Sequence, residues 1–165
     1  GEVNPTGRLP FTWPKHASSH IPYFRKHTED IHTDFSLNAF NPQFNFGDGL
    51  SYCQASIDSI TIDKSSYLID DTIELTVSVS NKSDCDATEV IQVYISDLVA
   101  SITPSVERLR HYKKVNIGPN ETLDFAMRIP LKDLGFIGID NSYVIESGRF
   151  KIRVNTSSKT FDLIK

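Results

Sequence analysis

Strict alternation of apolar and polar residues over positions 72–80 is the sequence feature that most constrains the fold. Ile73, Leu75, Val77 and Val79 are separated by single Glu, Thr and Ser residues. Successive side chains of a β-strand point to opposite faces, so this pattern places one face on a core and the other in water. The segment therefore predicts a half-buried β-strand.

Six further segments after residue 56 are expected to form strands, at residues 57–63, 90–95, 112–117, 123–129, 150–154 and 160–164. Residues 90–95 are apolar on nearly both faces, which predicts a strand that is central in its sheet or covered on its outer face. About seven strands, with turn signals every 8–12 residues, are typical of an immunoglobulin-like or fibronectin type III-like β-sandwich. No segment resembles an amphipathic helix, and we expect an all-β fold.

Charge and hydropathy exclude two classes of partner. The net charge is -4, and Lys and Arg are dispersed among the acids rather than clustered in the sequence. Nucleic acids and anionic membranes are therefore not expected to bind. The 165 residues suffice for one domain with an appendage, and the absence of Met at the start predicts a piece of a longer chain.

Residues 1–45 differ from the rest of the chain because they are rich in Pro, His and Phe and show no sustained period. A short strand is expected over residues 9–13, and the flanking Pro10 and Pro14 restrict it to an edge or terminal position. Five residues cannot bury a core, so this strand is expected to complete a sheet formed by chain outside the sequence.

Four histidines in this region raise the question of a metal site: His16, His20, His27 and His32. Neither a cysteine nor a pair of carboxylates completes a ligand set with them, and prolines interrupt the region. Structural metal sites need three or four converging ligands. We therefore favour a loop over a metal site, and the sequence contains no recognisable cofactor motif.

The stretch Phe46-Gly47-Asp48-Gly49-Leu50-Ser51-Tyr52 separates these two unlike parts. Glycine permits a positive φ and a close approach of the backbone to other groups. The paired glycines predict a sharp turn at a junction between two packed bodies, with Phe46, Leu50 and Tyr52 as docking side chains.

Cys53 and Cys85 are the two cysteines of the chain. If residues 57–63 and 72–80 form a hairpin in which Ile57 faces Val79, the same register brings Cys53 opposite Cys85. This register permits a disulfide in an oxidising compartment without requiring one, and a reducing compartment disfavours it. Secreted and cytoplasmic locations both remain open.

Three Asn-x-Ser/Thr sequences begin at Asn81, Asn120 and Asn155, in or beside expected turns. Such sequences accept N-linked glycans in secreted eukaryotic proteins. Because short patterns also arise by chance, these sites are candidates that do not decide the compartment.

Several ordered motifs resemble the C-terminal part of glycoside hydrolase family 3 enzymes, which include β-glucosidases and β-xylosidases. They are residues 1–14 (GEVNPTGRLPFTWP), 46–52 (FGDGLSY), 79–83 (VSNKS), 89–97 (EVIQVYISD), 107–115 (ERLRHYKKV), 118–122 (GPNET) and 147–152 (SGRFKI). The chain departs from the family pattern at Asp48, at Arg110-His111 and at Asn155. Because Asp48 departs from the pattern, the resemblance does not decide whether the junction loop contacts a ligand.

The resemblance implies a retaining β-glycosidase that uses two carboxylates, one as nucleophile and one as acid–base. In the family both carboxylates lie upstream of the region that this chain matches. No catalytic residue is therefore assigned, and Asp48, Glu89 and Asp97 are not proposed as substitutes. The implied partners are the upstream catalytic domains and a carbohydrate substrate near the junction, and no cofactor is implied.

The domain organisation that follows from the resemblance has three parts. Residues 1–45 are expected to be the last segment of an α/β-sandwich domain with a linker, residues 46–56 the junction, and residues 57–165 a fibronectin type III-like domain. The alternative is an independent module that binds carbohydrate or a protein. Sugar-binding surfaces usually expose coplanar aromatic rings, whereas Trp13 lies outside the sandwich and Tyr94 and Tyr112 are expected to pack within it.

Overall fold

A computed structural model describes residues 2–19, 21–23, 25–26 and 41–165. Its strands are β1 (Ala55–Ile62), β2 (Ser66–Leu68), β3 (Thr72–Asn81), β4 (Ala87–Asp97), β5 (Arg108–Ile117), β6 (Thr122–Pro130), β7 (Phe136–Ile137), β8 (Tyr143–Val144), β9 (Gly148–Val154) and β10 (Ser157–Ile164), with a short 3-10 helix η2 (Leu131–Leu134). No helix within these described residues is long and apolar enough to cross a membrane.

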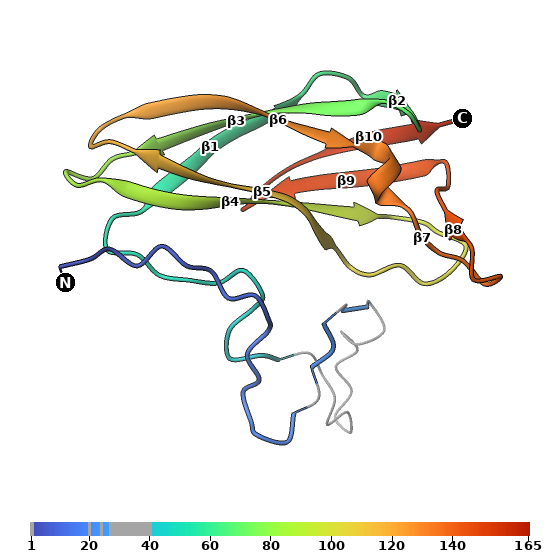
Figure 1. Ribbon diagram of the computed structural model, residues 1–165, viewed down its shortest axis with the longest axis horizontal. Coiled ribbons are helices and arrows are strands. Elements are labelled where there is room, and N and C mark those ends of the chain that lie inside the picture. Colours follow the sequence, from blue (N-terminus) through green and yellow to red (C-terminus); the bar gives the residue numbers. More distant parts are fainter. Residues whose placement is uncertain (1, 20, 24, 27–40) are drawn as a thin grey trace.

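Two sheets pack face to face as a β-sandwich (Figure 1). One sheet has the strand order β1-β3-β6, the other has the order β2-β10-β9-β4-β5, and β7 and β8 form a separate hairpin. The alternating residues of β3 lie in the core between the sheets, with Ile73, Leu75, Val77 and Val79 each fully buried. The predicted β-sandwich is thus confirmed, and each of the seven predicted strands is present.

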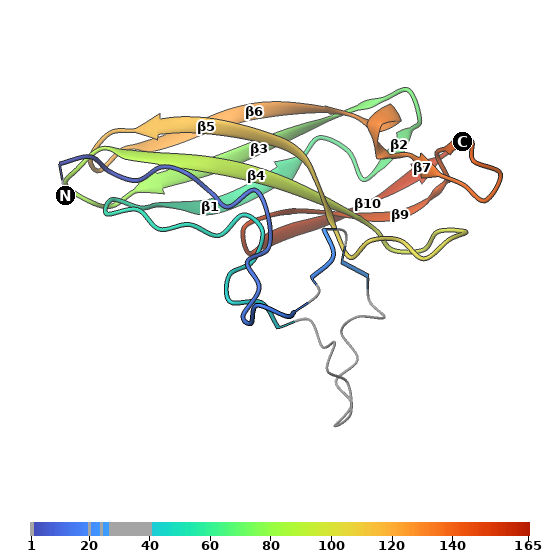
Figure 2. The ribbon, with the colours of Figure 1, turned by 60° about the horizontal axis from the view of Figure 1, so that its bottom comes forward.

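Strand β4 is both central in its sheet and covered on its outer face, the two alternatives that its apolar sequence predicts. It lies between β9 and β5 in the larger sheet, and Ile91 and Val93 point into the core. Its outer face is covered by the residues that precede β1, since Gly47 lies against Gln92 and Tyr94. Figure 2 shows these preceding residues running beside β4.

The hairpin of β1 and β3 has the predicted register, with Ile57 opposite Val79. The connection between them contains the short strand β2, which the sequence pattern did not reveal. Strand β2 pairs in parallel with β10, at the edge of the opposite sheet. Its Tyr67 is buried and donates a hydrogen bond of 2.8 Å to Asp63, and the connection therefore crosses from one sheet to the other.

The described residues that precede β1, here called the arm, project from the outer face of the larger sheet. The strand predicted over residues 9–13 is not formed. Trp13 instead makes an isolated antiparallel bridge with Phe44. Pro10 and Pro14 cannot donate ladder hydrogen bonds, and no strand lies beside this stretch among the described residues. The bridge between Trp13 and Phe44 therefore does not extend into a sheet.

Asn81 organises the end of the sandwich nearest the arm. Its side-chain nitrogen lies 2.8 Å from the Cys85 carbonyl oxygen, 3.1 Å from that of Ile117 and 2.9 Å from that of Gly118. Only 1% of Asn81 is exposed. One buried amide therefore joins the β3–β4 turn to the β5–β6 turn.

We expect Asn81→Ala to destabilise the sandwich by about 2–3 kcal/mol, because it leaves buried carbonyl groups without a donor. The free energy of unfolding in urea measures this loss. The exposed neighbour Lys82 provides a matched control, and Lys82→Ala should change the same quantity by less than about 0.5 kcal/mol. An equal loss in both variants contradicts this role of the amide.

Candidate functional site at the junction

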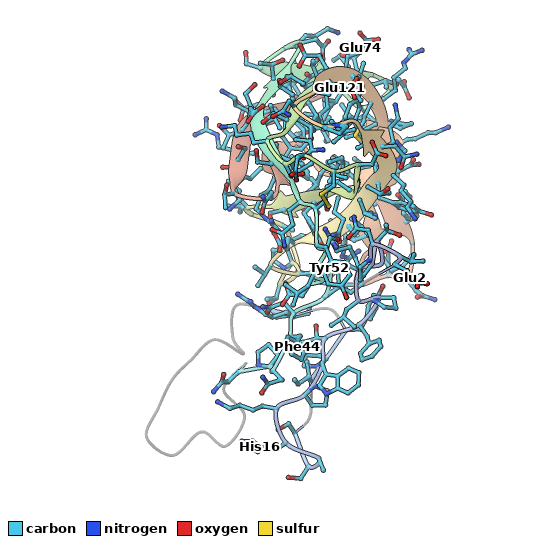
Figure 3. The ribbon with its side chains drawn as sticks, turned by 90° about the vertical axis from the view of Figure 1, so that its left-hand side faces the viewer. Glu2, His16, Phe44, Tyr52, Glu74 and Glu121 are labelled. Atoms are coloured by element: carbon cyan, nitrogen blue, oxygen red, sulfur yellow. A yellow bond between two sulfur atoms is a disulfide. The ribbon has the colours of Figure 1, made fainter. Side chains whose placement is uncertain are left out.

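Residues 4–9 run beside the junction motif and are joined to it by four hydrogen bonds. The Gly47 and Leu9 amides donate to the Leu9 and Asp48 carbonyls, at 2.8 and 2.9 Å. The Tyr52 amide donates to the Asn4 side chain at 2.8 Å, and the Ser51 hydroxyl donates to the Pro5 carbonyl at 2.6 Å. The N-terminal segment and the junction therefore form one body, shown below the sandwich in Figure 3.

The two glycines of the motif face different neighbours. Gly47 has φ +85°, and a Cβ on it would lie 2.5 Å from both the Gln92 Oε1 and the Tyr94 hydroxyl oxygen of β4. A Cβ on Gly49 would lie 2.5 Å from the Gly7 carbonyl oxygen. Gly47 thus allows the junction to approach the sandwich, and Gly49 allows it to approach the N-terminal segment.

An ion pair fixes the N-terminal segment directly to the sandwich. The Arg8 guanidinium lies 2.5 Å from a carboxylate oxygen of Glu89, and each side chain is 14% exposed. Lys114 on β5 also donates a hydrogen bond to the Thr6 hydroxyl at 2.8 Å. The segment is therefore anchored to two adjacent strands.

The Phe46 ring docks on an aromatic and charged group on the outer face of the larger sheet. Its edge-to-face contacts reach Tyr94 at 6.3 Å and Tyr23 at 5.8 Å between ring centroids. The Arg153 guanidinium lies over the Tyr94 ring and is held by Glu107 through two bonds of 2.6 and 2.8 Å. Burial raises the pKa of Tyr94 to about 12, and the nearby Arg153 opposes this rise.

The remaining motif residues have different surroundings. The Asp48 carboxylate accepts a 2.7 Å hydrogen bond from the Asn45 amide, which closes the tight turn. Leu50 is 80% exposed and Tyr52 is 68% exposed. The prediction that these two side chains dock against another body concerns chain outside the sequence and remains a prediction.

A disulfide joins Cys53, directly after the motif, to Cys85 in the β3–β4 turn, with 6.1 Å between their Cα atoms. The bridge closes a loop across a sequence separation of 32. Chain-entropy reasoning assigns such a loop about 3–4 kcal/mol of stabilisation through the unfolded state. The end of the arm is therefore covalently fixed to the sandwich.

The three glycosylation candidates lie in different environments. Asn120 and Asn155 are exposed in turns and have positive φ values of 55° and 52°. The side-chain nitrogen of Asn81 is buried among three carbonyls, and an attached glycan would require those contacts to break. The structure therefore favours a structural role for Asn81, while modification of Asn120 and Asn155 remains a prediction.

The carboxylates of Glu89 and Asp97 have partners in the structure. Glu89 is paired with Arg8, and Asp97 accepts a hydrogen bond from the Val99 amide. Burial raises the pKa of Asp97. Within residues 2–19, 21–23, 25–26 and 41–165, no three His, Cys, Asp or Glu side chains are grouped to hold a metal ion.

The histidine region is described only in part. His16 is exposed at the far end of the arm (Figure 3). His20, His27 and His32 lie outside the described residues.

The expectation that Tyr112 packs is wrong, because Tyr112 is 65% exposed on the edge strand β5, whereas Tyr94 is buried beneath the arm.

Two clefts flank the contact between the junction and the sheet, and neither was evident from the sequence. The first has a volume of about 500 Å³ and is rich in basic side chains from β5 and β9. The second has about 510 Å³ and is lined by side-chain amides such as Gln54 and Gln92 and by the Arg8–Glu89 pair. The two clefts adjoin each other at the docked Phe46 ring, because both are lined by Asn45, Phe46, Tyr94, Glu107 and Arg153.

Residues 89–158 match the fibronectin type III-like domain family. These residues belong to a fibronectin type III-like domain. They extend from β4 to the start of β10 and include the β4–β9 pairing at the centre of the larger sheet.

Comparisons with whole proteins cover nearly all of the chain. A lysosomal β-glucosidase of Dictyostelium discoideum is 33% identical over 93% of this chain, and a putative β-xylosidase of Formosa agariphila is 31% identical over 96%. The solved structure of a β-glucosidase from Erythrobacter marinus is 27% identical over 99% of this chain, with a TM-score of 0.89. The resemblance to the C-terminal part of family 3 glycoside hydrolases is thereby confirmed.

The chain spans only about a fifth of the length of these proteins: 19% of the D. discoideum protein, 21% of the F. agariphila protein and 22% of the E. marinus chain. It is therefore similar to one part of a longer polypeptide. The similarity includes the arm as well as the fibronectin type III-like domain.

We expect Gly47→Val and Gly49→Val to disturb docking of the arm while the sandwich keeps its own fold, because both added side chains would collide outside the core. Amide chemical shifts should change on the outer face of β4 for Gly47→Val and at residues 4–9 for Gly49→Val. Gly7→Val is the control for the shifts on β4, which it should leave unchanged, since nothing lies within 4 Å of a Cβ there. Unfolding of the whole sandwich in either variant would contradict this division.

Proposed function

We propose that the chain is the C-terminal part of a longer retaining β-glycosidase, and that its sandwich supports the catalytic domains of that enzyme. The observation that carries this proposal is the similarity of almost the whole chain to β-glucosidases and β-xylosidases about five times its length. The sandwich would have a structural role, and residues upstream of this chain would carry out catalysis.

The domain organisation proposed for the enzyme follows the three parts expected from the sequence. Residues 1–45 would belong to the last segment of an α/β domain and its linker, residues 46–56 to the junction, and residues 57–165 to the sandwich. The start of the regular strands at Ala55 supports this division. The exposed rings of Phe11, Trp13 and Phe44 are available to pack against the upstream domain.

The proposal places both catalytic carboxylates outside the chain. Retaining glycosidases need two carboxyl groups about 5–5.5 Å apart at an accessible site. Among the described residues that line the two clefts, Glu89 and Glu107 are bound to arginines and Asp48 closes a turn. These carboxylates already have structural roles, which supports an upstream location for the chemistry.

The 165-residue chain alone should not hydrolyse an aryl β-glucoside or β-xyloside, whereas the longer protein that contains it should do so. Release of the chromogenic phenol, compared with a heat-denatured sample of each protein, measures the activity. Turnover by the isolated chain above that background would place a catalytic site within it and refute the proposed division of roles.

We also propose that carbohydrate substrate comes near the junction, in the amide-lined cleft of about 510 Å³. Side-chain amides and paired charged groups are suited to hydrogen bonding with hydroxyl groups. Gln54, Gln92 and Asn155 contribute amide groups, and the Arg8–Glu89 pair forms part of the wall. Tyr94 and Phe46 supply its aromatic surface.

Titration of the chain with gluco- and xylo-oligosaccharides should produce saturable amide shifts around Gln54 and Gln92. Gln54→Ala should weaken these shifts, since one hydrogen-bonding partner is lost. Gln43→Ala, an exposed change on the arm that does not line the cleft, is the control. Shifts that are absent, or that are scattered over the sandwich, would refute this site without bearing on the catalytic role of the longer protein.

A further inference from the structure

The first cleft lies between the arm and the outer face of the larger sheet. Strands β4, β5 and β9 form its floor, and Thr12, Pro22, Tyr23 and Asn45 line it on the side of the arm. The Val106 amide donates a 2.8 Å hydrogen bond to the Arg25 carbonyl, which fixes the arm to the sandwich beside the cleft. Its volume of about 500 Å³ lies within the range of small-molecule sites.

Positive charge is concentrated on the lining of this cleft. Five basic side chains contribute to it: Arg25, Arg108, Arg110, Lys151 and Arg153. Glu107 is the one carboxylate among the described lining residues, and both of its oxygens are bound by Arg153. The lining is thus strongly basic although the whole chain carries a net charge of -4.

Two of these cations lie beside neutral polar groups, although the charges of Arg108 and Asp133 also act on Arg110. Arg110 donates weak hydrogen bonds of 3.3 and 3.5 Å to the carbonyls of Leu134 and Gly135. Lys151 lies in register between Ser96 of β4 and Thr160 of β10, which are both uncharged. Burial, followed by the neighbouring charge of Arg108, lowers the pKa of Arg110. A bound anion would offset both effects.

Aromatic rings stand beside these charges. Tyr23 is 66% exposed and makes an edge-to-face contact with Phe46, and both residues line the cleft. An exposed aromatic ring offers an apolar surface to a ring-shaped ligand, while guanidinium and ammonium groups bind oxyanions through charge-assisted hydrogen bonds. The lining therefore combines an aromatic surface for a ring with basic groups for an oxyanion, in a cleft large enough for a saccharide.

We propose that this cleft binds a small oxyanion carried on a saccharide-sized ring: a carboxylate, as in a uronic acid, or a phosphate, as in a sugar phosphate. Lys151 and Arg110 contact the oxyanion, and the ring lies toward Tyr23. The inference depends on the charges and shape of this cleft and not on the glycosidase proposal, which concerns residues outside the chain.

Isothermal titration of the 165-residue chain at low ionic strength tests the site with four probes: glucuronate, glucose 6-phosphate, inorganic phosphate and glucose. At least one of the acidic sugars should bind saturably, more tightly than inorganic phosphate, and glucose should not bind in this cleft. Comparison of the two acidic sugars distinguishes a carboxylate from a phosphate ligand. Added salt should weaken the binding, because the contacts are between charges.

Lys151→Met should weaken binding of the acidic sugar about tenfold, the effect expected from loss of one charge-assisted hydrogen bond. Arg110→Gln is the second variant, and the melting temperature of each verifies that it is folded. Lys159→Met is the matched control, since Lys159 is an exposed lysine of the neighbouring strand β10 and does not line the cleft.

Three outcomes would overturn the proposal. In the first, neither acidic sugar binds, or inorganic phosphate binds as well as they do. In the second, glucose competes with the acidic sugar at equal affinity. In the third, Lys159→Met weakens binding as much as Lys151→Met, which would show that the overall charge of the chain and not the cleft is responsible.

Discussion

The close approach of Gly47 to the outer face of β4 determines how the arm and the sandwich fit together. Its carbonyl accepts a 3.1 Å hydrogen bond from Gln92, and its φ of +85° turns the chain so that Phe46 meets Tyr94. A larger residue would separate the two surfaces. Both clefts exist because the junction touches the sheet at this narrow point and leaves space on either side.

The sequence predicted the sandwich well because its seven long strands have seven or more residues each, which is enough to display an apolar pattern such as the alternation of β3. The elements that it missed are short: β2 has three residues, and β7 and β8 have two each. So few residues cannot display a period, and their pairing depends on what lies beside them in space. The register of β4 and β5 also shifts between Val93 and Tyr94, which the apolar pattern of the sequence does not reveal.

At the candidate site, the motif identified the glycines but could not identify the residues that meet them. Gln92 and Glu89 lie far along the chain from Gly47 and Arg8, and no local pattern links them. The basic cleft was hidden for a related reason. Lys and Arg look dispersed in the sequence, yet β5 and β9 both contribute to the same lining from opposite sides of β4.

The arm is attached to strands of both sheets. The disulfide ends at Cys85, whose carbonyl oxygen is held by Asn81 at the end of β3. Asn81 also binds carbonyls at the end of β5, so β3 in one sheet and β5 in the other share this anchor. Displacement of the arm is opposed by the disulfide and the Asn81 hydrogen bonds at one end of the sandwich. It is also opposed by the contacts of Arg8, Gly47 and Phe46 with the outer face of the larger sheet. Because these links join different strands, displacement of the arm requires several of them to break together, which is the behaviour expected of a supporting domain.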